Sequence, residues 1–145
     1  MADLAENRRA RFDYEIEDTL EAGVELTGQE VKSIKSGRMN LGGSYAIFRD
    51  GELSLLNADV PPYQPNNMKE GYDSKRSRRL LLHKEELKSL IGKLNEKSYT
   101  FVPLRAYAKK GIIKIELGIA RSKKKGDKRE ALKKRAVERD IQREI

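Results

Sequence analysis

The side chains that could perform chemistry in this chain are mostly lysine and arginine, and they do not form a catalytic set. The sequence holds 31 Lys and Arg against 23 Asp and Glu, with one histidine and no cysteine. His83 follows an apolar triplet and has no nucleophile pattern around it, so a structural role is favoured over catalysis. Without cysteine, disulfides and thiolate metal sites are excluded. We therefore predict no enzymatic activity and no bound cofactor.

Alternating glutamates are the one candidate for metal binding. The polar side of an alternating segment carries four carboxylates, Glu15, Glu17, Glu21 and Glu25. Carboxylates can chelate a hard divalent ion, which leaves a metal-dependent nuclease open as an alternative. A solvated strand face explains the same pattern without a metal and is favoured. No glycine-rich phosphate loop precedes a helix-like segment.

Three basic clusters point instead to a polyanionic partner. They lie at residues 7–11, 75–79 and 121–129 of a chain whose formal net charge is +8. Such clusters bind phosphate in a salt-dependent way and carry no sequence readout by themselves. A solvated surface would explain one cluster, but three in a small basic chain favour nucleic acid. A membrane is less favoured, because no apolar run approaches the roughly 20 residues of a spanning helix.

The charge excess is concentrated near the C-terminal end. Residues 121–145 hold eleven Lys or Arg against five Asp or Glu. Leu132, Ala136 and Ile141 form only a thin apolar stripe, so a helix there is expected to be marginal alone and to form on a partner. The sequence thus divides into a polar and basic N-terminal arm at 1–11, a folded domain at 12–121 and a basic tail at 122–145.

Alternation and turn residues predict the first elements of the folded domain. Residues 14–26 alternate apolar and polar side chains with the exception of Asp18, which predicts a long strand with one buried face, bent near Gly23. Thr27 and Glu30 have the spacing of a capping box, so a helix is expected at 28–36. Strands are predicted at 44–49 and 52–57, joined by an Asp50-Gly51 turn.

The remaining elements complete a small α+β domain. After a loop at 58–76, a second helix is predicted from the helical spacing of Leu87, Leu90, Ile91 and Leu94. Two more strands are expected at 99–108, with a bulge or at an edge of the sheet, and at 113–119. Hairpin connections without a βαβ rhythm favour an antiparallel sheet. Closing such a sheet removes its edges, so a small antiparallel OB-like β-barrel with flanking helices is the expected architecture.

Five segments resemble the SsrA-binding protein (SmpB) family in order and spacing over most of the chain. They are Asn7-Arg-Arg-Ala-Arg-Phe-Asp-Tyr14, Glu21-Ala-Gly23, Leu26-Thr-Gly-Gln-Glu-Val-Lys-Ser33, Arg78-Arg-Leu-Leu-Leu-His-Lys84 and Asp127-Lys-Arg-Glu130. The resemblance implies an OB-like barrel without enzymatic activity. It also implies a cytoplasmic adaptor of trans-translation, which binds the tRNA-like domain of transfer-messenger RNA (SsrA RNA) and takes it to stalled ribosomes. A monomer bound one-to-one with RNA is expected.

The resemblance assigns residues to this role. Positions tied to the tRNA-like RNA are Asn7, Glu21 and Leu81, and whether Glu21 contacts RNA or positions a basic neighbour stays open. The same resemblance places phosphate contacts at Lys75, Arg76, Arg78 and Arg79, before the leucine triplet. The basic cluster of the arm by itself predicts phosphate contacts from Arg8, Arg9 and Arg11, with a mobile arm that contacts no RNA as the alternative. The tail residues Lys123, Lys124, Lys125, Asp127, Lys128 and Arg129 match a segment that becomes helical in the empty mRNA channel, beyond the decoding centre of the small subunit.

Two features of the tail depart from the family pattern. Ser122 stands where the family usually has glycine, and Gly126 stands where it usually has histidine or tyrosine. A ring expected to stack on a base of the decoding centre is therefore absent. A structural ribosomal or general RNA-binding protein, without specificity for transfer-messenger RNA, is the alternative function.

Overall fold

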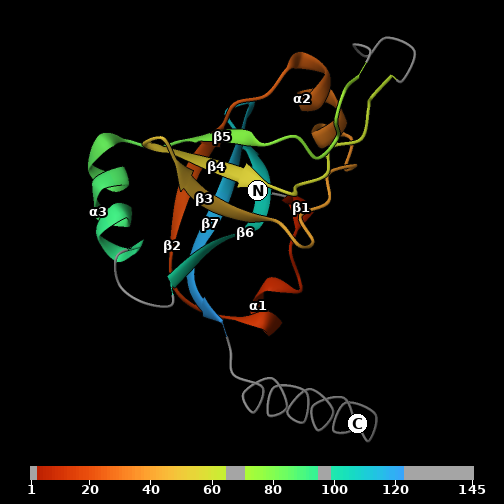
Figure 1. The fold of residues 1–145 in the computed structure, drawn as a ribbon. Helices are drawn as coiled ribbons and strands as arrows, with labels where there is room; N and C mark the ends of the chain where they lie inside the picture. Colours follow the sequence, from red (N-terminus) through yellow and green to blue (C-terminus); the bar gives the residue numbers. More distant parts are fainter. Residues whose placement is uncertain (1–2, 65–70, 95–98, 123–145) are drawn as a thin grey trace, which may run out of the picture.

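The computed structural model describes residues 3–64, 71–94 and 99–122, and within them it forms seven strands and three helices (Figure 1). In chain order the elements are β1 (Asp3–Glu6), α1 (Ala10–Asp13), β2 (Tyr14–Val24), α2 (Gly28–Lys35), β3 (Tyr45–Arg49), β4 (Glu52–Leu56), β5 (Arg78–Leu81), α3 (Lys84–Leu94), β6 (Tyr99–Lys109) and β7 (Ile112–Ser122). No helix in these ranges is long and apolar enough to cross a membrane.

The strands form one antiparallel sheet in the order β1-β6-β3-β4-β5-β2-β7. β6 also pairs with β7, so six strands are connected in a ring of pairings and β1 is added on β6. In Figure 1, α3 lies to the left of the sheet, α2 above it and α1 below it. The α+β class and the mostly antiparallel sheet expected from the sequence are thereby confirmed.

The main core is shared by the sheet and two of the helices. Leu55 of β4, Phe101 of β6 and Ile115 of β7 are fully buried. α2 adds Ile34 and α3 adds Leu90 to the same cluster. These apolar side chains hold both helices against the sheet. The polar first turn of each helix therefore lies at the border of the core.

The N-terminal segment differs from the arm expected at 1–11. Residues 3–6 form β1 and pair with β6, and Leu4 and Ala5 pack against the main core. The amide of Asn7 then donates to the carbonyl of Leu104 at 2.8 Å. A strand of four residues is too short to show an alternation that can be recognised in the sequence. It forms because it pairs with β6.

β2 does not bury a single face along its length. Ile16 is paired with Ala120 but Leu20 is paired with Leu117, with a register shift between Ile16 and Asp18. The two partners are three residues apart in β7, so Ile16 and Leu20 lie on opposite sides of the sheet. Ile16 packs in a small cluster with Ala120, whereas Leu20 packs against the main core. The prediction of one buried face is wrong, and the Asp18 exception marks the bulge.

Other local predictions are confirmed. The hydroxyl of Thr27 accepts from the Glu30 amide at 3.2 Å, and the Glu30 carboxylate accepts from the Thr27 amide at 2.9 Å, which completes the capping box of α2. Asp50 and Gly51 both have positive φ, 52° and 77°, as a tight hairpin turn requires. Of the two alternatives for β6, the structure shows a bulge after Pro103, while pairing with β1, β3 and β7 excludes an edge position.

Candidate nucleic-acid interface

A groove lies where β2 runs between β5 and β7, close to the start of α3; we call it the Glu21 groove. Its volume is about 450 Å³, and it is lined by Glu21, Gly23, Val24, Leu81, Leu82, His83, Glu86, Ile112 and Lys114. Gly23 of β2 is paired with Leu81 of β5 on one side and with Lys114 of β7 on the other. The fold therefore brings together Glu21 and Leu81, two of the residues that the resemblance assigns to RNA binding.

Exposed aliphatic side chains form the apolar part of the Glu21 groove. Leu81 is 47% exposed and Ile112 is 60% exposed. A Cβ atom on Gly23 would lie 3.3 Å from the Cβ of Leu81, so a larger residue there would press on Leu81. Ile112 and Lys114 were not predicted as site residues. The alternation that begins at Ile113 was the available signal for Ile112, because it leaves the preceding side chain facing outward.

Glu21 is held by two side chains of β6. The hydroxyl of Tyr107 donates to one carboxylate oxygen, and Nζ of Lys109 lies 3.5 Å from the other. The Tyr107 hydrogen bond, with a smaller contribution from Lys109, lowers the pKa of Glu21. The Glu21 side chain is still 37% exposed. The ionised carboxylate is thus accessible to a ligand, and it also holds Lys109 at the same surface.

A second groove lies at the other end of β5; we call it the Arg79 groove. Its volume is about 520 Å³, and it is lined by Glu25, Leu26, Thr27, Glu52, Ser54, Arg76, Ser77 and Arg79. Arg79 and Glu52 form an exposed ion pair at 3.4 Å. Since β5 alternates, Arg79 and Leu81 face outward while Arg78 and Leu80 are buried. The outward side of β5 therefore joins the two grooves.

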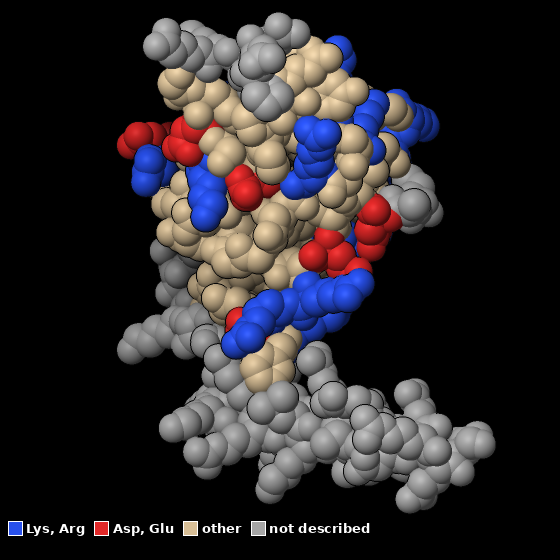
Figure 2. Space-filling view, turned by 90° about the vertical axis from the view of Figure 1, so that its right-hand side faces the viewer, with Lys and Arg blue, Asp and Glu red and all other residues tan. Residues whose placement is uncertain are grey.

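Charges of both signs are interleaved on the face shown in Figure 2. Several arginines on the sheet are paired within the protein: Arg105 lies 2.8 Å from Asp3 and 2.9 Å from Glu116. Arg121 lies 3.3 Å from Glu17, whose carboxylate also accepts from the hydroxyl of Tyr99. The basic excess is therefore presented as local clusters between acidic side chains.

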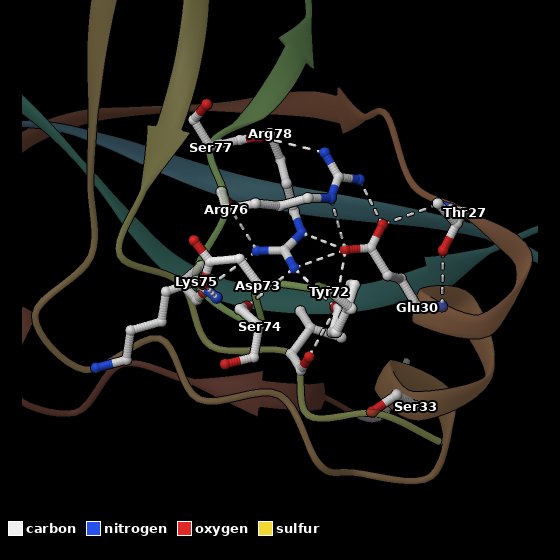
Figure 3. A network of polar contacts seen from close by, with 12 residues as sticks. Thr27, Glu30, Ser33, Tyr72, Asp73, Ser74, Lys75, Arg76, Ser77 and Arg78 are labelled. Atoms are coloured by element: carbon white, nitrogen blue, oxygen red, sulfur yellow. Dashed lines mark hydrogen bonds and ion pairs between the residues drawn. The ribbon is translucent and has the colours of Figure 1, made fainter. Parts of the chain in front are cut away.

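The basic run at 75–79 is not uniformly exposed (Figure 3). Arg78 is fully buried, and its Nε and Nη2 donate to the Oε2 atom of Glu30 at 2.8 and 2.6 Å. Nη1 of Arg78 donates to the carbonyls of Ala58 and Arg76 at 2.9 and 3.1 Å. A guanidinium enclosed in this way does not reach phosphate, which corrects the expectation for Arg78. The prediction failed because β5 starts at Arg78, two residues before the leucine triplet. The alternation of the strand then places Arg78 on its buried side.

Glu30 is the acceptor at the centre of this buried group. Arg76 donates to its two oxygens from Nε at 3.0 Å and from Nη2 at 2.5 Å, and the hydroxyl of Tyr72 lies 3.1 Å from Oε2. Burial raises the pKa of Glu30, but hydrogen bonds from Arg76, the Thr27 amide and Arg78 outweigh it and bring the pKa to about 2. From the sequence, Glu30 was predicted only to cap α2. Its partners are far away in the chain, and spacing gives no signal for them.

The other three basic residues of the run remain accessible to different degrees. Lys75 and Arg79 are exposed, and the side chain of Arg76 is 35% exposed beside Glu30. The phosphate contacts expected from these three residues are compatible with their positions. Arg76 and Arg79 both line the Arg79 groove.

Asn7, which the resemblance assigns to RNA binding, is buried at 7% exposure. Its Nδ2 donates to the carbonyl of Pro103 at 2.9 Å, and its Oδ1 accepts from the amide of Ala10 at 3.2 Å. The side chain joins the β6 bulge to the first turn of α1. Direct contact between this amide and RNA does not fit these bonds, so the geometry favours a structural role for Asn7.

The arginines that follow Asn7 lie at the surface around α1. Arg8, Arg9 and Arg11 are exposed. Nε of Arg9 lies 3.3 Å from Asp13, and its guanidinium lies 5.2 Å from the centre of the Phe12 ring. The tail residues assigned to the decoding centre, Lys123, Lys124, Lys125, Asp127, Lys128 and Arg129, lie outside the described residues.

The fold and these grooves define an α+β protein with a mostly antiparallel sheet and an extended polar and apolar surface suited to binding a macromolecule. The SmpB protein family matches residues 4–145, and the chain belongs to this family. It is 47% identical over 140 residues to the SsrA-binding protein of Trichormus variabilis, covering 97% of this chain and 90% of that protein. The corresponding protein of Staphylococcus saprophyticus is 52% identical over 142 residues, covering 98% and 92%.

A solved structure agrees with this assignment. The work on it is described as "tmRNA-SmpB: a journey to the center of the bacterial ribosome". The matched chain is 47% identical to this one and superposes with a TM-score of 0.68, covering 88% of this chain and 92% of that chain.

Proposed function

We propose that this protein is a non-enzymatic RNA-binding adaptor of trans-translation, which binds the tRNA-like domain of transfer-messenger RNA and delivers it to stalled ribosomes. The observation that carries the proposal is the meeting of Glu21 and Leu81 in one groove, continuous with the exposed Arg79 along β5. Family membership and the names of the relatives support it. The ring of strand pairings supports an OB-like barrel as the architecture of the RNA-binding domain.

The chemistry of the two grooves suits folded RNA. Leu81 and Ile112 offer apolar contact to riboses and to unpaired base faces, while Arg76 and Arg79 offer donors to phosphate oxygens. Glu21 holds Lys109 at the border of its groove. We infer that Glu21 acts in part by positioning this lysine for a phosphate of the RNA.

A competition experiment tests the proposal. The dissociation constant for the tRNA-like domain is measured at physiological salt, with an unrelated RNA duplex of equal length as competitor. A clear preference for the tRNA-like domain supports the adaptor. Equal affinity for both RNAs would reject it in favour of a general RNA-binding protein, because charge alone gives salt-dependent binding without selection.

The tail is assigned a separate step, in which its basic residues occupy the empty mRNA channel and the tail becomes helical there. A chain ending at Ser122 keeps every strand described above. It is expected to bind the tRNA-like domain with unchanged affinity and to lose the tagging of nascent chains on stalled ribosomes. Tagging by the truncated chain at the full rate would contradict the assigned tail role. The adaptor is placed in the cytoplasm as a monomer bound one-to-one with its RNA.

A further inference from the structure

The cluster formed by Glu30, Tyr72, Arg76 and Arg78, here called the Glu30 cluster, holds two charged side chains in the interior of the protein. Glu30 and Arg78 are fully buried. Removing a carboxylate and a guanidinium from water is costly, and well-packed apolar residues in their place are often as stable or more stable. The best-attested benefit of a buried ion pair is that it fixes register. The Glu30 cluster is therefore expected to fix the position of a neighbouring segment.

The cluster joins three segments that are distant in the chain (Figure 3). Arg78 reaches the carbonyl of Ala58 at 2.9 Å, and the hydroxyl of Tyr72 donates to the carbonyl of Val60 at 2.8 Å. The amide of Val60 donates to the carbonyl of Ser74 at 2.9 Å. Residues 58–60 and 72–78 are thereby tied to each other. Glu30, in the first turn of α2, binds the side chains of Tyr72, Arg76 and Arg78, and so connects the 72–78 segment to α2 directly and residues 58–60 through it.

The segment that follows the cluster is β5, a strand of only four residues. Its inward side chains are Arg78 and Leu80, and its outward side chains are Arg79 and Leu81. A slip of one residue would exchange the two sets. If Glu30 lost its charge, Arg78 would be a buried cation without a compensating negative charge. A slip of β5 by one residue would let the guanidinium of Arg78 reach water. Arg79 and Leu81 would then turn inward.

We propose that Glu30 is a positioning residue for RNA binding. By holding Arg78 inside the protein it fixes the register of β5, and this presents Arg79 to one groove and Leu81 to the other. Glu30 has no accessible surface and acts through Arg78 without touching RNA. The inference rests on the proposed function, because it gives a role to the outward side of β5.

The first test compares two isosteric substitutions, Glu30→Gln and Glu52→Gln. Each removes one negative charge from the partner of an arginine, and Glu52 is the exposed partner of Arg79. Charge alone predicts tighter RNA binding by both variants. Positioning predicts that Glu30→Gln binds the tRNA-like domain more weakly, by about tenfold or more. Glu52→Gln is expected to bind at least as tightly as the unmodified chain. Unweakened binding by Glu30→Gln would overturn the proposal.

The second test measures the register of β5 without RNA. The chain has no cysteine, so a single introduced thiol reports on its own position. Leu81→Cys is expected to react with a maleimide much faster than Leu80→Cys, because Leu81 is exposed and Leu80 is buried. In a Glu30→Gln background Leu81→Cys is expected to react more slowly and Leu80→Cys faster, because a slip of β5 exchanges the two faces. Rates that stay as different as before would overturn the proposal even if RNA affinity fell, because a loss of stability alone does not exchange the two faces.

The third test separates positioning from direct contact by Arg78. Combining Glu30→Gln with Arg78→Met removes the cation that would otherwise leave the core. The double variant is expected to bind RNA more tightly than Glu30→Gln alone. Weaker binding by the double variant would mean that Arg78 itself contacts RNA, which overturns the proposal. If the unmodified chain showed no preference for the tRNA-like domain, the proposed function would fail, while the thiol rates would still decide whether Glu30 sets the register.

Discussion

Glu30 and Glu21 have similar partners at very different depths. Each carboxylate lies beside a tyrosine hydroxyl, Tyr72 at 3.1 Å from Glu30 and Tyr107 donating to Glu21, and each is paired with basic side chains. Each therefore has a pKa below the ordinary value and is ionised at neutral pH. Glu30 is inaccessible, whereas Glu21 opens into a groove beside Lys109. The comparison shows that depth, and not the set of partners, separates a carboxylate that holds a strand from one that can meet a ligand.

The same contrast applies to the arginines of the basic run. Arg78 and Arg79 are neighbours in β5, but the first is buried with all its donors near acceptors and the second is exposed beside Glu52. A basic run in a strand is thus divided by alternation into structural and available charges. Counting its lysines and arginines overestimates the phosphate contacts that it can make.

The largest expected effect distinguishes the two glutamates by stability. Glu30→Ala leaves Arg78 buried without its partner, so we expect the free energy of unfolding to fall by about 3–5 kcal/mol. Urea denaturation followed by circular dichroism measures this loss. Glu21→Ala is the matched control and is expected to lower the denaturation midpoint much less, because Lys109 is exposed and only the hydroxyl of Tyr107 loses an acceptor. Equal losses in the two variants would remove the distinction between them.

The stability of the folded protein at acidic pH is expected to depend on the ionisation of Glu30. The pKa of Glu30 in the folded protein is about 2, below the ordinary value of 4.5. A carboxylate with a lowered pKa contributes its full stability above the ordinary pKa, and the contribution is lost as pH falls toward the folded value. The free energy of unfolding is therefore expected to fall more steeply between about pH 5 and pH 2 in the unmodified chain than in Glu30→Gln. Parallel curves for the two chains would contradict this cause.

Local signals in the sequence were sufficient for much of the fold. The capping box at Thr27 and Glu30 and the Asp50-Gly51 turn depend on residues close in the chain, and both form as predicted. The exchange of faces in β2 was missed because a bulge is decided by the register of the partner strand, and the sequence of β2 showed only one exception, at Asp18. β1 was missed for a related reason, since a strand of four residues depends on its pairing with β6.

Less of the candidate site than of the fold could be predicted from the sequence. Glu21 and Leu81 came from the resemblance, and their meeting in one groove depends on the pairing of β2 with β5. Ile112 was missed because an exposed isoleucine has no charge or motif to mark it. Arg78 was misassigned because burial of a guanidinium requires a distant acceptor, and Glu30 lies 48 residues away. Contacts between distant segments are the part that local pattern could not supply.

Reversal of the charge at Glu21 is expected to change RNA binding without unfolding the protein. Glu21→Lys replaces an accessible carboxylate with a cation and removes the partner of Lys109, so we expect weaker and less selective binding of the tRNA-like domain. The fold is expected to remain, because Glu21 faces the groove and not the core. Competition binding measures the selectivity, and circular dichroism checks the fold. A collapsed fold in Glu21→Lys would show that the outward side of β2 has been misassigned.

The smallest expected effect comes from the tyrosine partner of Glu21. Tyr107→Phe removes the hydrogen bond that chiefly lowers the pKa of Glu21, so this pKa is expected to rise toward its ordinary value while the fold stays intact. Carboxyl carbon NMR titration of Glu21 measures the change.

Tyr72→Phe is the matched variant beside the buried carboxylate, where the carbonyl of Val60 would lose a donor at 2.8 Å. We expect Tyr72→Phe to cost about 1–3 kcal/mol of stability. A larger loss in Tyr107→Phe than in Tyr72→Phe would mean that the hydroxyl beside the accessible carboxylate supports the fold more than the hydroxyl beside the buried carboxylate. The depth of the carboxylate would then not separate the two sites.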